Sequence, residues 1–193
     1  MAPIIRRMRA ADNAFDVRVV FTGQHRDLLR QAARAFGITP DVDLDVMSDD
    51  QSLSGLLSRL LVGLDAQLAS ERPELVVAQG DTTTVLATAL ACHQRGVRFV
   101  HVEAGLRTAD IATPFPEEAN RRLTSLMTHL HCAPTEAARK ALLAEGISPE
   151  HVLMSGNTVV DALLDTLREP LPLPITVDPT RLLALVTLHR RES

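Results

Sequence analysis

The sequence predicts an α/β fold with a doubly wound parallel sheet that is covered by helices on both faces. Short runs rich in β-branched residues alternate with stretches of helical periodicity, which is the pattern of parallel strands joined by crossover helices. The 193 residues are 46% apolar and 23% charged. This composition is typical of a globular protein and provides for one domain, or for one domain plus a fragment.

Five short apolar runs before residue 169 predict strands. They cover residues 17–21, 75–78, 97–102, 130–133 and 152–154. Helices are predicted over residues 25–36, 51–70, 82–95, 115–128, 135–145 and 157–168. Residues 1–11 also show helical periodicity, with Ile4, Ile5 and Met8 on one face, so the first predicted element is a helix and not a strand.

Three prolines at alternate positions follow Glu169, and they exclude a helix and predict an extended linker. We therefore predict an N-terminal domain over residues 1–168 and a linker over residues 169–180. A further buried strand is predicted over residues 182–188. A lone strand has no core of its own, so residues 181–193 either begin a second domain that is absent or add a strand to the first sheet.

Charge and cysteine content exclude several classes of partner. Lys and Arg total 20 against 24 Asp and Glu, and no basic stretch is concentrated enough to predict binding to nucleic acid or to an anionic membrane. No apolar run approaches the ~20 residues that a membrane span needs. Cys92 and Cys132 lack metal-site spacing and follow no signal peptide, which predicts a reduced, cytoplasmic setting. The histidines show no metal-site spacing either.

Polar residues follow two of the predicted strands at the point where ligands bind in open α/β sheets. The sequence GDTTT at residues 80–84 offers a tight glycine turn, hydroxyls and amides for an anion, and Asp81 as an acid, a base or a ligand for sugar hydroxyls. Alternatively, Asp81 or Thr82 only caps the next helix. After the next strand, Glu103 suits proton transfer and Arg107 suits a phosphate or a carboxylate. The alternative is a structural network, either between Glu103 and Arg107 or among Asp81, Glu103 and an arginine.

Three further places are candidates for the same site. Glu117 and Arg121 lie four residues apart on one predicted helix, as in an ordinary ion pair or as part of a site. Asn157 follows the strand at residues 152–154, where a plain helix cap is the simpler interpretation. His189 and Arg190 follow the last predicted strand and suit a diphosphate. Together these residues predict a site for a phosphorylated small molecule.

Six motifs resemble those of the non-hydrolysing UDP-N-acetylglucosamine 2-epimerase family, in the family's order and spacing. They are TGQHRD at 22–27, GDTTT at 80–84, HVEAGLRT at 101–108, PEEANR at 116–121, GNTVVDAL at 156–163 and HRRES at 189–193. The resemblance implies two Rossmann-like domains in a glycosyltransferase-B-like architecture, with the nucleotide sugar in the cleft between them. This chain resembles the first domain.

The resemblance also implies a reaction and its partners. The family interconverts UDP-N-acetylglucosamine and UDP-N-acetylmannosamine for cell-surface polysaccharides, by anti elimination of UDP to 2-acetamidoglucal and syn re-addition. It uses neither a metal nor a redox cofactor, and a homodimer is its usual assembly. By resemblance, the catalytic residues are Asp81, Glu103, Glu117 and His189. The substrate-binding residues are Thr82, Arg107, Arg121, Asn157 and Arg190. Gln24 matches a regulatory site for a second substrate molecule, whereas Asp50 stands where that site has an arginine.

Two parts of the family pattern are not found in the sequence. Family members begin with a central strand that leads into a Gly-Thr-Arg-Pro-Glu loop and a lysine, and they end with a second domain. The resemblance therefore implies a truncated chain that lacks its first central strand, and we expect it to be inactive or nearly so by itself. The alternatives are a non-catalytic half-protein that binds a nucleotide sugar or a partner, and a hydrolysing epimerase that releases UDP and free N-acetylmannosamine.

Overall fold

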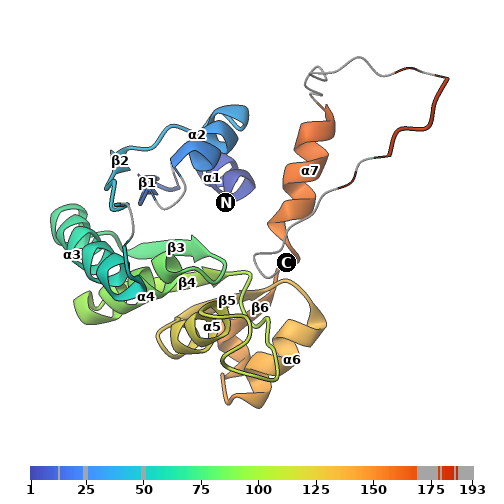
Figure 1. The fold of residues 1–193 in the computed structure, drawn as a ribbon. Coiled ribbons are helices and arrows are strands. Elements are labelled where there is room, and N and C mark those ends of the chain that lie inside the picture. The colour runs from blue at the N-terminus through green and yellow to red at the C-terminus, as the bar shows by residue number, and fades with distance from the viewer. Residues whose placement is uncertain are drawn as a thin grey trace.

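The computed structural model describes residues 1–12, 14–23, 26–48, 51–168, 178, 180–184 and 186. Within them, helices and strands alternate as the sequence predicts (Figure 1). The helices are α1 (Ala2–Arg9), α2 (Arg26–Ala35), α3 (Leu53–Glu71), α4 (Thr83–Arg95), α5 (Glu117–Leu126), α6 (Glu136–Ala144), the 3-10 helix η1 (Pro149–His151) and α7 (Thr158–Arg168). The strands are β1 (Val20–Phe21), β2 (Val42–Asp43), β3 (Leu75–Gln79), β4 (Arg98–Val102), β5 (Leu130–Ala133) and β6 (Val152–Met154).

All strand pairs in the described residues are parallel, which confirms the predicted α/β class. The strands nevertheless fall into two sheets where the sequence pattern predicts one. One sheet has the order β3-β4-β5-β6, and β1 and β2 form a separate pair. The alternation of strands and helices in a sequence encodes their order but not which edges meet. Within the described residues, β3 is an edge strand of the larger sheet.

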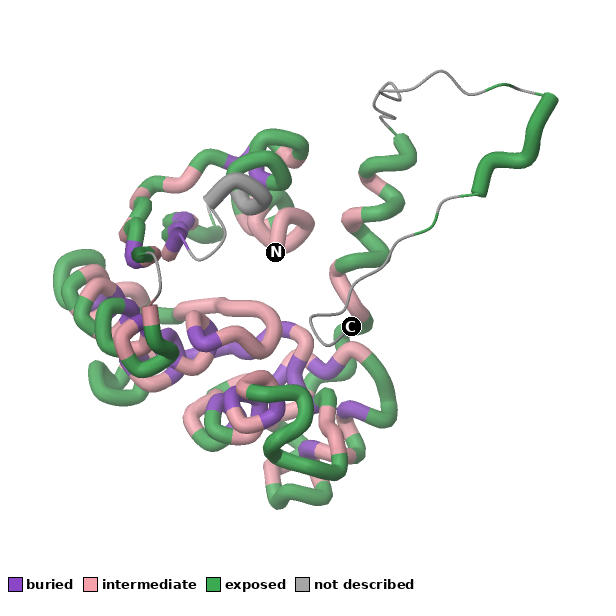
Figure 2. Tube along the Cα trace, viewed as in Figure 1, coloured by how far each residue is buried: buried purple, intermediate pink, exposed green. Residues whose placement is uncertain are grey.

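The largest core cluster lies where α3 and α4 pack on each other beside β3 and β4. Leucines at every fourth position of α3 form one apolar stripe, in which Leu60 is fully buried. Small residues on α4 let the two helices approach closely, and Phe99 of β4 fills the space beneath them. Cys92 belongs to this cluster, and burial raises the pKa of its thiol to about 12. Figure 2 shows these buried positions in purple.

Two smaller clusters hold the flanking parts of the chain. Val19 and Phe21 of the β1 region pack with Ala33 and Ile38 around α2. A third cluster joins the end of β4 and β5 to α6, and its members are Ala104, Ala133, Ala138 and Leu142. The start of α6 is set by Thr135, whose hydroxyl accepts a hydrogen bond from the Ala138 amide at 3.2 Å.

We predict that the cap of α3 stabilises the fold by a measurable amount. The Ser52 hydroxyl accepts a hydrogen bond from the Gly55 amide at 3.1 Å, so Ser52→Ala leaves that amide without its partner. The substitution should lower the free energy of unfolding by about 1 kcal/mol in urea denaturation. Ser58→Ala, at an exposed position inside the same helix, is the matched control and should leave the midpoint unchanged. Equal midpoints for the two variants would contradict the capping role.

The carboxyl-terminal part of the structure is anchored by few contacts. Helix α7 lies beside α1, where Arg6 and Asp165 approach within 3.7 Å, and most of its apolar side chains are exposed (Figure 1). The strand predicted over residues 182–188 is wrong at every described position, because residues 182–184 and 186 are exposed and lie in no strand. An apolar run forms a strand only where a neighbouring strand offers hydrogen bonds. The other positions of that run lie outside the described residues.

Candidate active site

The candidate active site lies at the carboxyl ends of β3, β4 and β6. Asp81, Glu103 and Asn157 each follow one of these strands, and the parallel pairing brings the three ends to the same edge of the sheet. The turn after β3 is tied to β4 by a hydrogen bond from the Gly80 amide to the Val102 carbonyl, at 3.1 Å. The fold therefore gathers three of the residues that the sequence predicts for the site.

Glu103 is held by two side-chain amides, one at the end of β3 and one after β6. The Gln79 amide donates to one carboxylate oxygen at 3.2 Å, and the Asn157 amide donates to the other at 3.4 Å. The backbone of Glu103 is left-handed, with φ 68°, which a residue other than glycine rarely adopts. Such conformations persist where the surrounding structure enforces them, and they cluster at functional sites. The site thus fixes both the backbone and the carboxylate of Glu103.

Asp81 is held from the other side by helix α5. Its carboxylate pairs with the Arg121 guanidinium at 2.8 Å, and its backbone carbonyl accepts a hydrogen bond from the Asn120 amide at 2.9 Å. Thr82 occupies the N-cap position of α4, but its side chain accepts no capping hydrogen bond in the described residues. Thr82 thus takes the cap position that one interpretation predicts, without the side-chain hydrogen bond of a cap, and the Asp81 carboxylate pairs with Arg121 instead. The Thr82 hydroxyl and the Asp81 carboxylate both lie beside the start of α4.

Glu118 is an acidic residue of this region that the sequence analysis does not single out. It is fully buried, and it accepts hydrogen bonds from Arg121 at 2.9 Å, from Arg122 at 2.7 Å and from the Thr108 amide at 3.2 Å. Burial acts to raise the pKa of Glu118, but these three donors outweigh it and hold the pKa below its usual value. The spacings to residues 121 and 122, three and four positions on, are the signal that could have identified it.

The predicted ion pair between Glu117 and Arg121 is wrong. The side chain of Arg121 is only 9% exposed, and its guanidinium pairs with Asp81 and Glu118. Glu117 is half-buried on the first turn of α5, with no hydrogen bond or ion pair to any residue that the structure describes. Its carboxylate thus has no fixed partner among the described residues, and its role at the site stays a prediction.

Arg107 does not join Glu103 or Asp81 in a network, as one interpretation of the sequence held. Its guanidinium forms a two-pronged pair with Glu145, at 2.7 and 2.8 Å, and also donates to Ser125 at 2.8 Å. The hydrogen bonds from Arg107 lower the pKa of Glu145. The substrate contact predicted for Arg107 stays a prediction, and this pair would have to open before the guanidinium could bind a phosphate.

The side chains of Asn157 and His101 both contact backbone groups near the site. Asn157 caps the start of α7, because its side-chain oxygen accepts a hydrogen bond from the Val159 amide at 3.0 Å while its amide contacts Glu103. The simpler interpretation of Asn157 as a cap is thus confirmed together with a site contact. His101 is fully buried in β4, and its Nε2 lies 2.7 Å from the Gly80 carbonyl oxygen. Burial lowers the pKa of His101.

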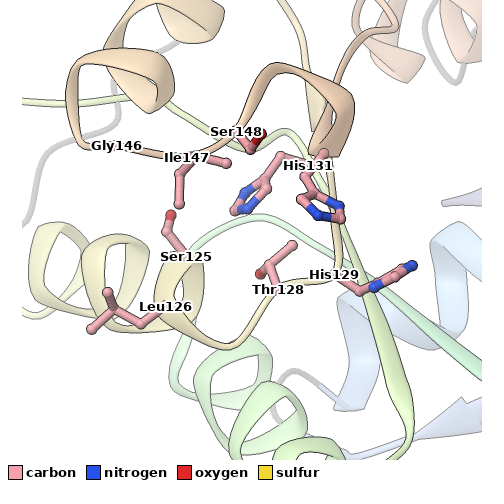
Figure 3. Close-up of a pocket in the computed structure, with 9 residues that line it drawn as sticks. Ser125, Leu126, Thr128, His129, His131, Gly146, Ile147 and Ser148 are labelled. Carbon is pink, nitrogen blue, oxygen red and sulfur yellow. The ribbon is translucent and has the colours of Figure 1, made fainter.

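A cavity of about 250 Å³ lies elsewhere, toward the amino ends of β5 and β6 (Figure 3). Its lining residues are Ser125, Leu126, Thr128, His129, His131, Gly146, Ile147, Ser148 and His151. His131 is fully buried, and neither ring nitrogen has a hydrogen-bond partner in the described residues. Burial lowers the pKa of His131 to about 4. None of the predicted site residues lines this cavity, so the candidate active site is defined by its polar contacts.

Four predicted residues lie outside the described part of the chain. They are Gln24, Asp50, His189 and Arg190. In the part that is described, no group of three or more His, Cys, Asp or Glu side chains is arranged to hold a metal ion. No described helix is long and apolar enough to cross a membrane.

Comparison with known proteins identifies the family of this chain. The family model described as UDP-N-acetylglucosamine 2-epimerase matches residues 7–193. The chain belongs to this family. The resemblance carried by the six sequence motifs is therefore confirmed.

Individual members of the epimerase family show the same likeness. A UDP-N-acetylglucosamine 2-epimerase of Escherichia coli is 44% identical over an alignment of 203 positions. The alignment covers 100% of this chain and 54% of that protein. The UDP-GlcNAc 2-epimerase of Neisseria meningitidis, solved bound to UDP-GlcNAc, has a TM-score of 0.85 at 41% identity, over 88% of this chain and 45% of that one. The Methanocaldococcus jannaschii UDP-GlcNAc 2-epimerase, in complex with UDP-GlcNAc and UDP, has a TM-score of 0.80 at 35% identity, over 86% and 45%. The chain thus spans about half the length of the curated relatives it matches.

Proposed function

We propose that this chain supplies one half of an enzyme that interconverts UDP-N-acetylglucosamine and UDP-N-acetylmannosamine. The observation that carries the proposal is the pair of carboxylates at adjacent strand ends, Asp81 and Glu103, each held by its own polar partners. Family membership and the solved relatives that bind UDP-GlcNAc support the substrate class. We further propose that residues 1–168 form its first domain and that residues 169–180 link it to a second.

The chemistry requires acid and base groups on both faces of one carbon atom. In the elimination step, a carboxylate takes the proton from C2 of the sugar, the C1–O bond to UDP breaks, and 2-acetamidoglucal remains bound with UDP. In the return step, the UDP oxygen adds to C1 and a proton reaches C2 from the opposite face. The C2 proton is weakly acidic, so positioned carboxylates and stabilisation of departing UDP must act together.

The carboxylates of the proposed site lie in different surroundings, which suits different roles. Among the described residues, Asp81 contacts the cation of Arg121, Glu103 contacts two uncharged side-chain amides, and Glu117 contacts no donor. Arg121 and Thr82 lie beside Asp81, where they would orient the sugar or the diphosphate. The roles of His189 and Arg190 at the diphosphate, and of Gln24 at a regulatory site, remain proposals of the same kind.

Deuterium exchange tests the proposed reaction directly. In heavy water, the enzyme with both halves present should introduce deuterium at C2 of UDP-N-acetylglucosamine and form UDP-N-acetylmannosamine, as read by proton NMR and mass spectrometry. This two-domain enzyme is the parent for the rate measurements below, and the present chain by itself should show little or no exchange. Release of UDP with free N-acetylmannosamine would instead identify a hydrolysing epimerase. The absence of exchange together with measurable binding of UDP would identify a binding module. Sedimentation of the same sample tests the homodimer, and fractionation of cells tests the cytoplasmic location.

A further inference from the structure

Glu118 is not one of the proposed reacting groups, but it contacts Arg121, which in turn contacts Asp81. We propose that Glu118 is a positioning residue that sets the Asp81 carboxylate by orienting the guanidinium of Arg121. This inference rests on the proposed epimerase function. Glu118 is fully buried in the first turn of α5, so it is not part of the exposed surface of the site.

The geometry of Arg121 divides its donors between two carboxylates. Its Nε and one terminal nitrogen both lie 2.9 Å from a single Glu118 oxygen, and the other terminal nitrogen lies 2.8 Å from the Asp81 carboxylate. The guanidinium is planar and its donors form a fixed fork. Two contacts to Glu118 therefore fix its plane, and the remaining donor can only point at Asp81.

Charge balance explains why a second arginine is present. Glu118 is fully buried, so its carboxylate needs cations and hydrogen bonds to remain charged. Arg122 supplies one such cation, since its Nε donates to the second Glu118 oxygen at 2.7 Å. Because Arg122 supplies this charge, Arg121 can also donate to the Asp81 carboxylate. The arrangement amounts to two carboxylates and two guanidinium groups in contact, with one guanidinium shared.

The same network reaches the loop that follows Glu103. The Thr108 amide donates to Glu118 at 3.2 Å, and the Thr108 carbonyl accepts from Arg122 at 3.1 Å. Both backbone groups of Thr108 are thus held by the first two turns of α5. Glu118 therefore links the loop after β4, which begins with Glu103, to the loop after β3 that carries Asp81.

The proposal makes Glu118→Gln the decisive variant. Glutamine keeps the size of the side chain, but its amide has a single acceptor oxygen, so its NH2 group must face either the donors of Arg121 and Thr108 or the donor of Arg122. In either orientation the negative charge is lost, so the guanidinium of Arg121 is held less firmly in its present orientation. A misplacement of about 1 Å at a reacting group costs up to roughly a hundredfold in rate. We expect kcat for C2 exchange to fall roughly 10- to 100-fold, with KM changed less than about threefold.

Two comparisons separate positioning from a general effect on the fold. Glu136→Gln removes a carboxylate from an exposed pair with Arg139 that has the same three-residue spacing, and it should leave kcat at the parent value. The double variant Asp81→Asn and Glu118→Gln should be no slower than Asp81→Asn alone, because Glu118 acts on the rate only through the Asp81 carboxylate. Losses that multiply in the double variant would overturn the proposal, as would a Glu118→Gln protein that turns over at the parent kcat once its folded fraction is counted.

A measurement that needs no turnover keeps the proposal testable if the epimerase function fails. In nitrogen-15 NMR, the Arg121 Nε–H signal of the parent should exchange slowly with water, because it is hydrogen-bonded and nearly buried. Glu118→Asp keeps the charge but shortens the side chain by about 1.5 Å, so exchange should speed up and the Asp81 carboxyl carbon signal should shift. Absence of C2 exchange in the parent would overturn only the proposed function. Unchanged Arg121 and Asp81 signals in folded Glu118→Asp would overturn the positioning role alone.

Discussion

Replacing Glu103 by glutamine should lower the rate of C2 deuterium incorporation into UDP-N-acetylglucosamine by roughly 10²- to 10⁴-fold, the range expected for loss of a positioned acid or base. The amide of glutamine cannot take up the C2 proton, although it has nearly the shape of the carboxylate that Gln79 and Asn157 now contact. Glu103 is the cleaner choice for this test. Asp81→Asn would also break the contact with Arg121, so its effect would combine chemistry with structure.

The measurement is the initial rate of exchange in heavy water, followed by proton NMR at saturating substrate. Glu74→Gln is the matched control, because Glu74 is an exposed residue before β3 whose carboxylate makes only a long contact among the described residues, to Arg98 at 3.9 Å. Its rate should equal that of the parent. Circular dichroism and the melting temperature of Glu103→Gln should remain near the parent values. A folded Glu103→Gln protein with parental exchange would show that Glu103 takes no part in the proton transfer.

The sequence predicts the strand ends well because periodicity and strand polarity are local properties. Alternation of apolar runs and helices places Asp81, Glu103 and Asn157 after strands, and parallel pairing then brings these ends together. The first element is a helix, as its periodicity predicts, and Asn157 caps α7 as its position suggests. These predictions need no knowledge of which elements meet in space.

Pairings between charged residues were harder to predict because tertiary contacts choose among equal spacings. Helix α5 offers Glu117–Arg121, Glu118–Arg121 and Glu118–Arg122 at three or four residues, and only the packing of the helix decides which face turns inward. Arg107 meets Glu145 across 38 residues of sequence, which no local pattern indicates. The apolar run at residues 182–188 forms no strand at its described positions, 182–184 and 186, because a strand depends on hydrogen bonds from a partner edge that the run itself does not encode.

Acid should destabilise the fold through His131 before the carboxylates titrate. Burial lowers the pKa of His131 to about 4 in the folded chain, with further lowering by the charges of His101, Arg107 and His151 and an opposing effect of Glu145. In the unfolded chain the pKa is about 6.5. Above pH 6.5 the ring is neutral in both states. Between about pH 6.5 and 4 the unfolded chain binds a proton that the folded chain does not, so folding stability falls as the pH falls.

The size of this effect follows from the difference between the two pKa values. At about 1.4 kcal/mol per pKa unit, His131 alone should remove about 3 kcal/mol of unfolding free energy between pH 6.5 and 4. Urea denaturation at steps of pH measures this slope, and His131→Gln should reduce it. The slope of stability against pH decides the matter, because the substitution itself shifts the absolute stability.

His101 is also buried with a lowered pKa, so part of the slope should remain in His131→Gln. His93→Gln, at an exposed position on α4, is the control and should keep the full slope. A His131→Gln slope equal to the parental slope would show that the ring accepts a proton in the folded state, which would require a hydrogen-bond partner at the cavity that the buried ring lines.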